Sequence, residues 1–365
     1  MNDPLMLTFD LGTQSMRGML VDKKGQIISI VQHKYAQPYF SKQPGWAEQK
    51  PQFYYETLCK ISQELKQKSP DGYQRVIATT VTTIRDSCLC IDENCEPLTD
   101  VILWLDSRET NTIKPFKWWV KAALRIAGME EALKHQYQIT SANWIMENQP
   151  EIWDKTYKYI LLSTYLNYRL SGQLKDCPAN MIGHVPFNYK KGVWQSPSDL
   201  KRGMCDIPNK MLCELIETGD TIGMVQHKAC EETGIPENTP LILSGSDKGC
   251  ETLGLSVINE DQAALSFGTT ATIQFSTKHY FEPEKFLPAY PGVAKGTFNP
   301  EIEIYRGYWL ISWFKKEFAE KECVEAEKLN CSAEEILNKR LSEIPPGCKG
   351  LILQPFWTPG VVKPD

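Results

Sequence analysis

The first residues that could do chemistry lie in a short segment near the start of the sequence, 10–15, which reads Asp-Leu-Gly-Thr-Gln-Ser. Gly12 lets the backbone come close to a ligand, and the successive N–H groups of a turn, with the Thr13 hydroxyl, can bind phosphate oxygens. Asp10 is suited to Mg²⁺, which prefers one or two carboxylates plus waters and phosphates. Arg17 adds positive charge. A plain β-hairpin turn with a polar tip explains the same residues, and the segment alone favours that interpretation.

A second candidate is Asp247, which follows a short apolar segment, 241–243, and the small residues Ser-Gly-Ser. Phosphoryl transfer needs a base positioned for the attacking hydroxyl, and an approachable carboxylate in this setting can supply it. The same Asp could instead be the N-cap of a helix over 250–255. Position alone favours neither interpretation.

Arg85 and Asp86 stand between two apolar segments, 76–81 and 88–91. Arg offers several donors in a fixed fork and Asp accepts hydrogen bonds, so that the pair suits sugar hydroxyls. A surface salt bridge in a turn is the commoner case. Trp104 could be a face on which a sugar stacks, although a single Trp is more often a core residue.

The sequence shows no spacing of Cys and His that is typical of a zinc site. His135 and His184 lack the spacing of metal ligands, and packed or solvated side chains are the simpler interpretation for both. The 12 Cys residues are spread along the chain without a CxxC motif. Reduced, mostly buried thiols are therefore expected.

The elements that must position these residues follow from hydrophobic periodicity. Strands are expected over 5–9, 16–21, 26–31, 76–81, 88–91, 241–243, 265–267 and 271–275, and helices over 54–65, 115–134, 151–170, 227–233, 308–320 and after a capping box of Ser332 with Glu335. The pattern of strand, Gly-Thr turn and strand thus occurs twice, near residue 12 and near residue 268. A duplication would give each of two domains one hairpin that faces phosphate.

Length and composition set the outer limits. A chain of 365 residues suggests two domains. The net charge is −5 with scattered Lys and Arg, unlike the basic surface of a nucleic-acid-binding protein. The sequence shows no signal peptide and no apolar run of membrane-spanning length, so a cytoplasmic location without membrane partners is expected. It stops soon after an apolar run, 351–353, and we expect an incomplete second domain.

Taken in order, six segments resemble the FGGY carbohydrate kinases, a family that includes glycerol kinase, xylulokinase, gluconokinase and ribulokinase. They are 9–13 (FDLGT), 44–49 (PGWAEQ), the Arg85-Asp86 turn, 104–108 (WLDSR), 245–247 (GSD) and 265–269 (LSFGT). The resemblance covers essentially the whole chain and implies an α/β fold of two actin-like (ribonuclease H-like) domains with a cleft between them. We expect a sugar-binding domain over 1–257 and the start of a nucleotide-binding domain over 258–365.

The resemblance also implies the reaction, which is ATP-dependent phosphorylation of a sugar or polyol hydroxyl by a xylulokinase-like or related enzyme. In this interpretation Asp247 is the catalytic base and Asp10 is associated with Mg²⁺. The phosphates of ATP would contact Gly12, Thr13, Gln14, Arg17, Gly268 and Thr269, and the substrate would contact Arg85, Asp86, Trp104, Asp247 and Lys248. The expected partners are a small sugar or polyol and ATP, and a homodimer is compatible with the family.

Two residues depart from the family pattern. Lys248 stands where the family usually has Gln or Asn, and Asp86 stands where glycerol kinase has Glu. Xylulokinase usually has Met-His at the Arg85-Asp86 position, so the chain matches neither enzyme cleanly. A Lys beside the base would favour a substrate with a carboxylate. Lys248 could instead pair with Asp247, point along the cleft towards the γ-phosphate of ATP, or lie on the solvent side.

Two other functions remain open. One is a non-catalytic actin-like protein that binds a sugar or nucleotide, against which the presence of Asp10 and Asp247 argues. The other is a plain ATPase, which has no need of the segments around Trp46, Arg85 and Trp104.

Overall fold

The computed structural model describes residues 3–113, 125, 130–268, 270–284, 287–304 and 307–353. The chain divides into two compact units. The first unit is Met1–Gln262 with Ser276–Pro300, and the second is Ala263–Phe275 with Glu301–Asp365. The expected domain limits, 1–257 and 258–365, stay predictions. No helix within the described ranges is long and apolar enough to cross a membrane.

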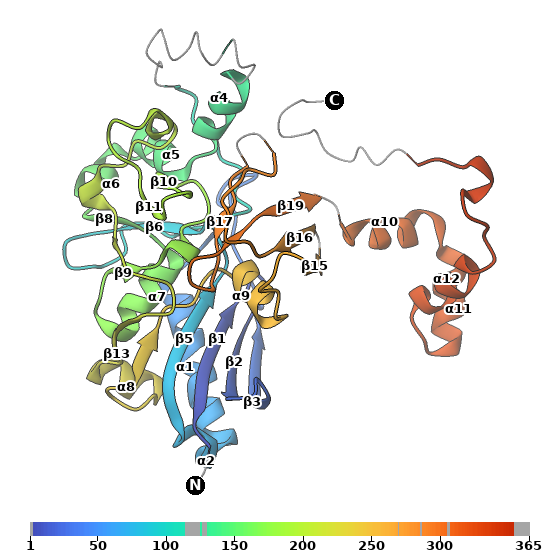
Figure 1. Cartoon of the computed structure of the whole chain (residues 1–365), viewed down its shortest axis with the longest axis horizontal. Helices are drawn as coiled ribbons and strands as arrows, with labels where there is room; N and C mark the ends of the chain where they lie inside the picture. The colour runs from blue at the N-terminus through green and yellow to red at the C-terminus, as the bar shows by residue number, and fades with distance from the viewer. Residues whose placement is uncertain are drawn as a thin grey trace. The chain divides into compact units, whose positions relative to one another are not determined.

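The first unit is built on a mixed six-stranded sheet in the order β13-β14-β5-β1-β2-β3 (Figure 1). Its strands are β1 (Leu5–Leu11), β2 (Ser15–Asp22), β3 (Ile27–Lys34), β5 (Val76–Thr83), β13 (Thr221–Met224) and β14 (Pro240–Ile242). β1 and β14 both run parallel to β5, whereas β2, β3 and β13 are antiparallel to their neighbours. The carboxyl ends of β1, β5 and β14 therefore lie at the same edge of the sheet.

Helix α1 (Pro51–Lys68) packs against β2 and β3. Its buried side chains include Tyr54, Leu58, Ile61 and Leu65, the spacing expected from the sequence. Gly18 on β2 allows this close contact, because a Cβ there would collide with Ile61 and Leu65. Fully burying an apolar side chain of this size contributes about 1.5–3 kcal/mol. The helix therefore holds the β1–β2–β3 meander in its twisted sheet.

A second sheet of the first unit has the order β4-β7-β6-β8. Its strands are β4 (Glu48–Gln49), β6 (Cys88–Ile91), β7 (Val101–Ile102) and β8 (Lys158–Leu161). A buried cluster beside it includes Cys88, Ile102, Trp144 and Tyr159. The neighbouring helices are α4 (Glu130–Gln138), α5 (Ser141–Asn148), α6 (Pro150–Lys155) and α7 (Leu162–Ser171).

The helix predicted over 151–170 is wrong, because this segment forms α6, β8 and α7 in succession. β8 pairs antiparallel with β6, and Tyr159, Ile160 and Leu161 are all buried. A strand buried on both faces shows no alternation of polar and apolar residues, so periodicity cannot distinguish it from a buried helix. Most of the helix predicted over 115–134 lies outside the described residues.

Shorter elements complete the first unit. They are α2 (Pro70–Tyr73), α8 (His227–Thr233), α9 (Asp247–Gly254), the strand pairs β9 (Lys175–Asp176) with β12 (Glu214–Leu215), β10 (Phe187–Asn188) with β11 (Val193–Trp194) and β17 (Tyr290–Pro291) with β18 (Phe298–Asn299), and 3₁₀ turns at Pro178–Asn180, Leu200–Met204 and Asn209–Met211. The predicted end of α8 is confirmed, because Gly234 adopts the left-handed conformation with φ 75°.

The second unit contains the antiparallel strands β15 (Ala263–Phe267), β16 (Ala271–Phe275) and β19 (Glu301–Ile304), so the second predicted hairpin is confirmed. Its helices are α10 (Trp309–Phe318), α11 (Glu320–Leu329) and α12 (Ala333–Leu341), followed by a 3₁₀ turn at Cys348–Gly350. Ser332 and Glu335 form the predicted capping box of α12, a motif whose cap is worth about 1 kcal/mol.

Candidate active site

Three strand ends of the first unit bring the candidate residues to one edge of the sheet. Leu11 at the end of β1 accepts a hydrogen bond from Ile84 N at 3.0 Å, just beyond β5. Thr83 forms a parallel bridge with Ser246, which immediately precedes Asp247. The turn after β1 (residues 12–14, the β1 turn), the Arg85-Asp86 turn and Asp247 therefore follow neighbouring strands. They lie at the edge where α/β sheets bind ligands.

The turn after β1 contains backbone N–H groups without an acceptor in the described part of the chain. Gly12 N donates to Ser15 O at 3.0 Å, whereas no residue of the described part of the chain accepts from the N–H groups of Thr13 and Gln14. Two successive unpaired N–H groups at a turn tip are suited to an anion. Asp10 accepts a hydrogen bond from Arg17 at 2.8 Å, and about a third of its side chain is exposed. A single accessible carboxylate beside a turn that is suited to an anion fits Mg²⁺, which keeps several of its waters.

Asp247 is the first residue of α9, and the N-cap is Ser246, whose Oγ accepts from Gly249 N. The N-cap interpretation of Asp247 is therefore wrong. The Asp247 carboxylate accepts from Lys248 N at 2.8 Å and lies 3.6 Å from Arg85 Nε. Burial raises the pKa of Asp247 above its ordinary value, although Arg85 opposes the shift. A raised pKa makes the ionised carboxylate a stronger base.

Asp86 is held by a residue that the sequence did not single out for function. His184 Nδ1 lies 2.6 Å from Asp86 Oδ2, and His184 N donates to Asp86 Oδ1 at 2.8 Å. Burial alone would raise the pKa of Asp86, but His184 outweighs it and holds that pKa below its ordinary value. Burial alone would lower the pKa of His184, but Asp86 raises it above its ordinary value. The contact therefore favours the ionised form of the Asp86 carboxyl and the protonated form of the His184 imidazole.

This pair places strict demands on the backbone. Asp86 has φ 47°, in the left-handed region that Asp tolerates better than most residues. Gly183 has φ 130°, and a Cβ there would collide with the Asp86 carboxylate. Because Gly183 has no side chain, His184 N can reach Asp86. The interpretation of Arg85 and Asp86 as a surface salt bridge within their own turn is therefore wrong, because Asp86 contacts His184.

Two tyrosines, also not singled out from the sequence, stand beside Arg85. The Arg85 guanidinium lies 5.7 Å from the ring centre of Tyr290. The rings of Tyr290 and Tyr189 meet edge to face, with centroids 5.5 Å apart. Tyr189 Oη donates to Gly183 O at 3.2 Å. Arg85 is thus backed by an aromatic wall that also supports the loop carrying His184. No short motif marks either tyrosine.

The remaining predicted site residues are Trp104, Lys248, Gly268 and Thr269. Trp104 is 48% exposed, so the core interpretation is wrong, and its Nε1 donates to Thr13 Oγ1 at 2.9 Å. Lys248 Nζ pairs with Glu251 at 2.9 Å along α9. Gly268 belongs to the second unit, where its N donates to Thr270 O at 2.9 Å. Thr269 lies outside the described residues.

Ion pairs fix the segment that carries Trp104. Arg108 donates to Glu48 at 2.9 Å and to Asp106 at 2.7 Å, and Asp106 also accepts from Ala47 N at 2.6 Å. The Arg108 guanidinium lies 4.0 Å from the ring centre of Trp46. Two segments that carry the sequence resemblance, 44–49 and 104–108, therefore hold each other, and this contact positions Trp104 beside the β1 turn.

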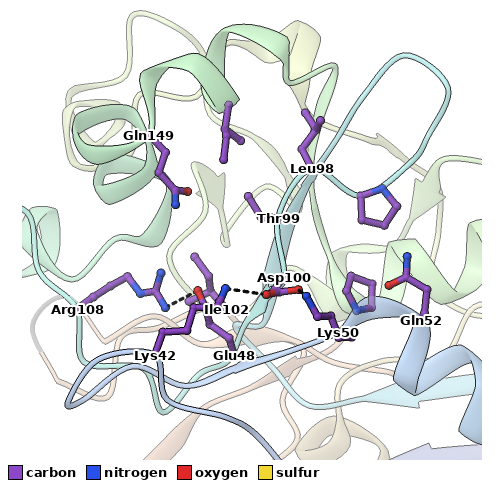
Figure 2. Close-up of a pocket in the computed structure, with 13 residues that line it drawn as sticks. Lys42, Glu48, Lys50, Gln52, Leu98, Thr99, Asp100, Ile102, Arg108 and Gln149 are labelled. Atoms are coloured by element: carbon purple, nitrogen blue, oxygen red, sulfur yellow. Dashed lines mark hydrogen bonds and ion pairs between the residues drawn. The ribbon is translucent and has the colours of Figure 1, made fainter.

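A pocket of about 360 Å³ lies next to this network and is lined by none of the predicted site residues (Figure 2). Lys42 and Lys50 point into it and both pair with Asp100, at 2.9 and 2.8 Å. Lys42 also lies 3.0 Å from Glu48. Because these charges neutralise one another, we interpret the residues around the pocket as an ion-pair network that stabilises the fold.

Comparisons with known proteins place these observations in a family. The model of the N-terminal domain of the FGGY family of carbohydrate kinases matches residues 5–254. An uncharacterized sugar kinase of Escherichia coli, YgcE, is 23% identical over 359 residues, which cover 98% of this chain and 65% of the relative. A xylulose kinase of Lactococcus lactis is 24% identical over 352 residues, 96% of this chain and 67% of the relative. The chain thus spans about two thirds of the length of the curated relatives it matches.

Solved structures agree in fold. A xylulose kinase from Rhodospirillum rubrum superposes with a TM-score of 0.80 at 20% identity, covering 96% of this chain and 70% of that one. A gluconate kinase from Lactobacillus acidophilus gives a TM-score of 0.77 at 21% identity, with 97% and 69% covered. The expected fold class, an actin-like α/β fold, is confirmed.

Proposed function

Because the chain belongs to the FGGY family of carbohydrate kinases, we propose that it takes part in ATP-dependent phosphorylation of a sugar or polyol hydroxyl. The observation that carries the proposal is the placement of Asp247. Its carboxylate, with a raised pKa, lies 3.6 Å from Arg85 Nε at the sheet edge that also carries the β1 turn. A base, a cationic donor and an anion-binding turn are the parts that phosphoryl transfer requires.

Asp247 would accept the proton of the attacking hydroxyl while that oxygen forms a bond to the γ-phosphorus of ATP. The bond from the γ-phosphorus to the bridging oxygen breaks, and ADP leaves with the electron pair. Arg85 and Lys248 N fix the orientation of the Asp247 carboxylate. Most of the rate acceleration in such sites comes from positioning and charge neutralisation.

The β1 turn would bind phosphate oxygens through the N–H groups of Thr13 and Gln14, with Gly12 allowing close approach. Arg17 would exchange its contact with Asp10 for a phosphate oxygen. Asp10 is then free to hold Mg²⁺, which supplies charge neutralisation on the phosphates when bound. A role for Gly268 and Thr269 as the second phosphate contact stays a prediction from the sequence.

The substrate would bind against Arg85, Asp86, Trp104 and Lys248, next to Asp247. The relatives carry several names, among them xylulose kinase, gluconokinase and autoinducer-2 kinase. All of these names fit a small polyhydroxylated acceptor. The finer proposal is a xylulokinase-like or related enzyme in which Lys248, next to Asp247, shifts the preference towards an acceptor with a carboxylate. The panel below tests it.

The test is ADP release from ATP and Mg²⁺ in the presence of D-xylulose, D-gluconate, glycerol or erythritol. ADP release that depends on one of these acceptors and disappears in Asp247→Asn supports the proposal. Acceptor binding without ADP release indicates the non-catalytic alternative, and ADP release without any acceptor indicates a plain ATPase. Light scattering tests whether the chain forms a homodimer, and cell fractionation tests the expected cytoplasmic location.

A further inference from the structure

His184 contacts Asp86 in a way that leaves one side of its imidazole ring available. Both contacts with Asp86 use the backbone N and the Nδ1 edge of the ring, at 2.8 and 2.6 Å. Throughout the described ranges, no residue is a hydrogen-bond partner of His184 Nε2. About a quarter of the His184 side chain stays exposed, as for Asp247, so the ring borders the accessible part of the site. A ring fixed at one nitrogen and available at the other is arranged to contact a ligand.

The loop that carries His184 is held from several sides. Asp86 N donates to Ile182 O at 3.1 Å, and Cys205 Sγ donates to His184 O at 3.4 Å. Tyr189 Oη donates to Gly183 O at 3.2 Å. The position of the ring is therefore set by the protein before any substrate arrives, and this preorganisation favours binding.

The charge state of the ring depends on few groups. The titratable and charged groups around the pair are Arg85 and Asp86 in the turn after β5, Cys88 on β6, Tyr159 on β8, Tyr189 after β10, and Cys205 after the Leu200–Met204 turn. Burial raises the pKa of both tyrosines and of both thiols, so all four stay uncharged at neutral pH. Asp86 is thus the group that governs whether His184 carries its second proton.

We propose that His184 donates a hydrogen bond from Nε2 to an oxygen of the bound sugar, and that Asp86 is the positioning residue that fixes the imidazole through Nδ1. The inference rests on the proposed function, because it takes the ligand to be the sugar or polyol acceptor. It makes His184 a specificity-determining residue beside Arg85. Asp86 would then act on the substrate through His184, in addition to any direct contact.

The experiment compares two variants that each keep one nitrogen. His184→Asn retains a donor near the position of Nδ1, and His184→Gln retains one near the position of Nε2. Calorimetry with D-xylulose, D-gluconate, glycerol or erythritol, without ATP, measures acceptor affinity. We expect His184→Asn to weaken binding about 10- to 100-fold, the usual effect of losing a hydrogen bond to a charged group, and His184→Gln to stay within about threefold.

A purely structural role predicts the opposite order, with His184→Asn near wild type and His184→Gln weak, and that result overturns the inference. Affinity unchanged in both variants also overturns it. The matched control is His227→Asn, which removes another carboxylate-paired histidine on the exposed face of α8. Melting temperatures of all variants check that each is folded.

The pH profile and NMR decide the case in which both variants bind weakly. Above the raised pKa of His184, Nε2 loses its proton and becomes an acceptor, so wild-type affinity should fall as pH rises through that value. A flat profile overturns the inference. The chain has 5 His, so ¹⁵N-histidine spectra are simple, and the acceptor should shift the Nε2 signal that His184→Asn removes.

These readouts separate the two proposals. Acceptor binding with the expected variant pattern but no ADP release overturns the proposed function and supports the role of His184. Acceptor-dependent ADP release with unchanged affinity in both variants overturns the role of His184 alone.

Discussion

Arg85 Nε lies 3.6 Å from Asp247 Oδ1, so that the turn after β5 and the start of α9 share one ion pair. Both side chains are about a quarter exposed or less, and the pair sits where the parallel strands end. The contact couples the group expected to bind the sugar to the group expected to take its proton. A change at Arg85 should therefore affect catalysis, through Asp247, as well as acceptor binding.

Asp247→Asn should lower kcat about 10²- to 10⁴-fold, the usual scale for loss of a general base. Acceptor affinity should change little, because Asn keeps the size of the side chain and can still accept from Lys248 N. Asp199→Asn is the control, since Asp199 caps a surface 3₁₀ turn and Asn caps equally well. Turnover near wild type in Asp247→Asn would show that another group is the base.

Arg85→Gln should move the acid limb of the kcat profile to higher pH. Burial already raises the pKa of Asp247, and Arg85 opposes that shift, so removing Arg85 raises the pKa further. More of the base is then protonated at a given pH. The raised pKa of Asp247 has a second consequence. Protonation of Asp247 contributes to the free energy of unfolding at low pH, and this contribution is lost as the pH rises through the pKa of the folded protein. Arg340→Gln, which breaks ion pairs of the second unit, is the control. An acid limb that stays at the same pH would show that Arg85 does not influence the pKa of the base.

Gly183→Ala should destabilise the protein more than Gly219→Ala. Both glycines have positive φ, 130° and 88°, but a Cβ at Gly183 would collide with the Asp86 carboxylate, whereas one at Gly219 meets nothing within 4 Å. The difference should be roughly 1–3 kcal/mol in the free energy of unfolding, measured in urea. Acceptor affinity should fall only in Gly183→Ala. Equal effects in the two variants would mean that the Asp86–His184 pair tolerates the added methyl group.

Lys248 should favour an anionic acceptor. Its ammonium group lies 2.9 Å from Glu251 on α9, next to the proposed base, and a carboxylate of the substrate can compete for its donors. The expected result is a higher kcat/KM for D-gluconate than for D-xylulose, glycerol or erythritol, and loss of this preference in Lys248→Gln. Lys228→Gln on α8 is the control. A preference for a neutral acceptor that Lys248→Gln leaves unchanged would remove this role.

The sequence alone determined the parts that depend on local order. The β1–β2–β3 meander, α1, the end of α8 and the capping box of α12 follow from periodicity and from local side-chain chemistry, which neighbouring residues carry. The order of six short motifs was enough to identify the family. Each motif is a run of neighbouring residues, so it can be recognised without knowledge of the fold. These motifs named Asp10, Arg85 and Asp247, and the structure places all three turns at one sheet edge.

Only the tertiary structure decided which partners these residues meet. Asp86 and His184 are 98 residues apart, and Trp104 and Thr13 are 91 apart, so no local pattern could pair them. The strand β8 was mistaken for helix for the same reason, since its pairing with β6 is a long-range contact. Hydrogen bonds between distant segments depend on how the chain packs. A sequence pattern records which groups can form hydrogen bonds, whereas packing selects the bonds that form, such as the contact between Asp86 and His184.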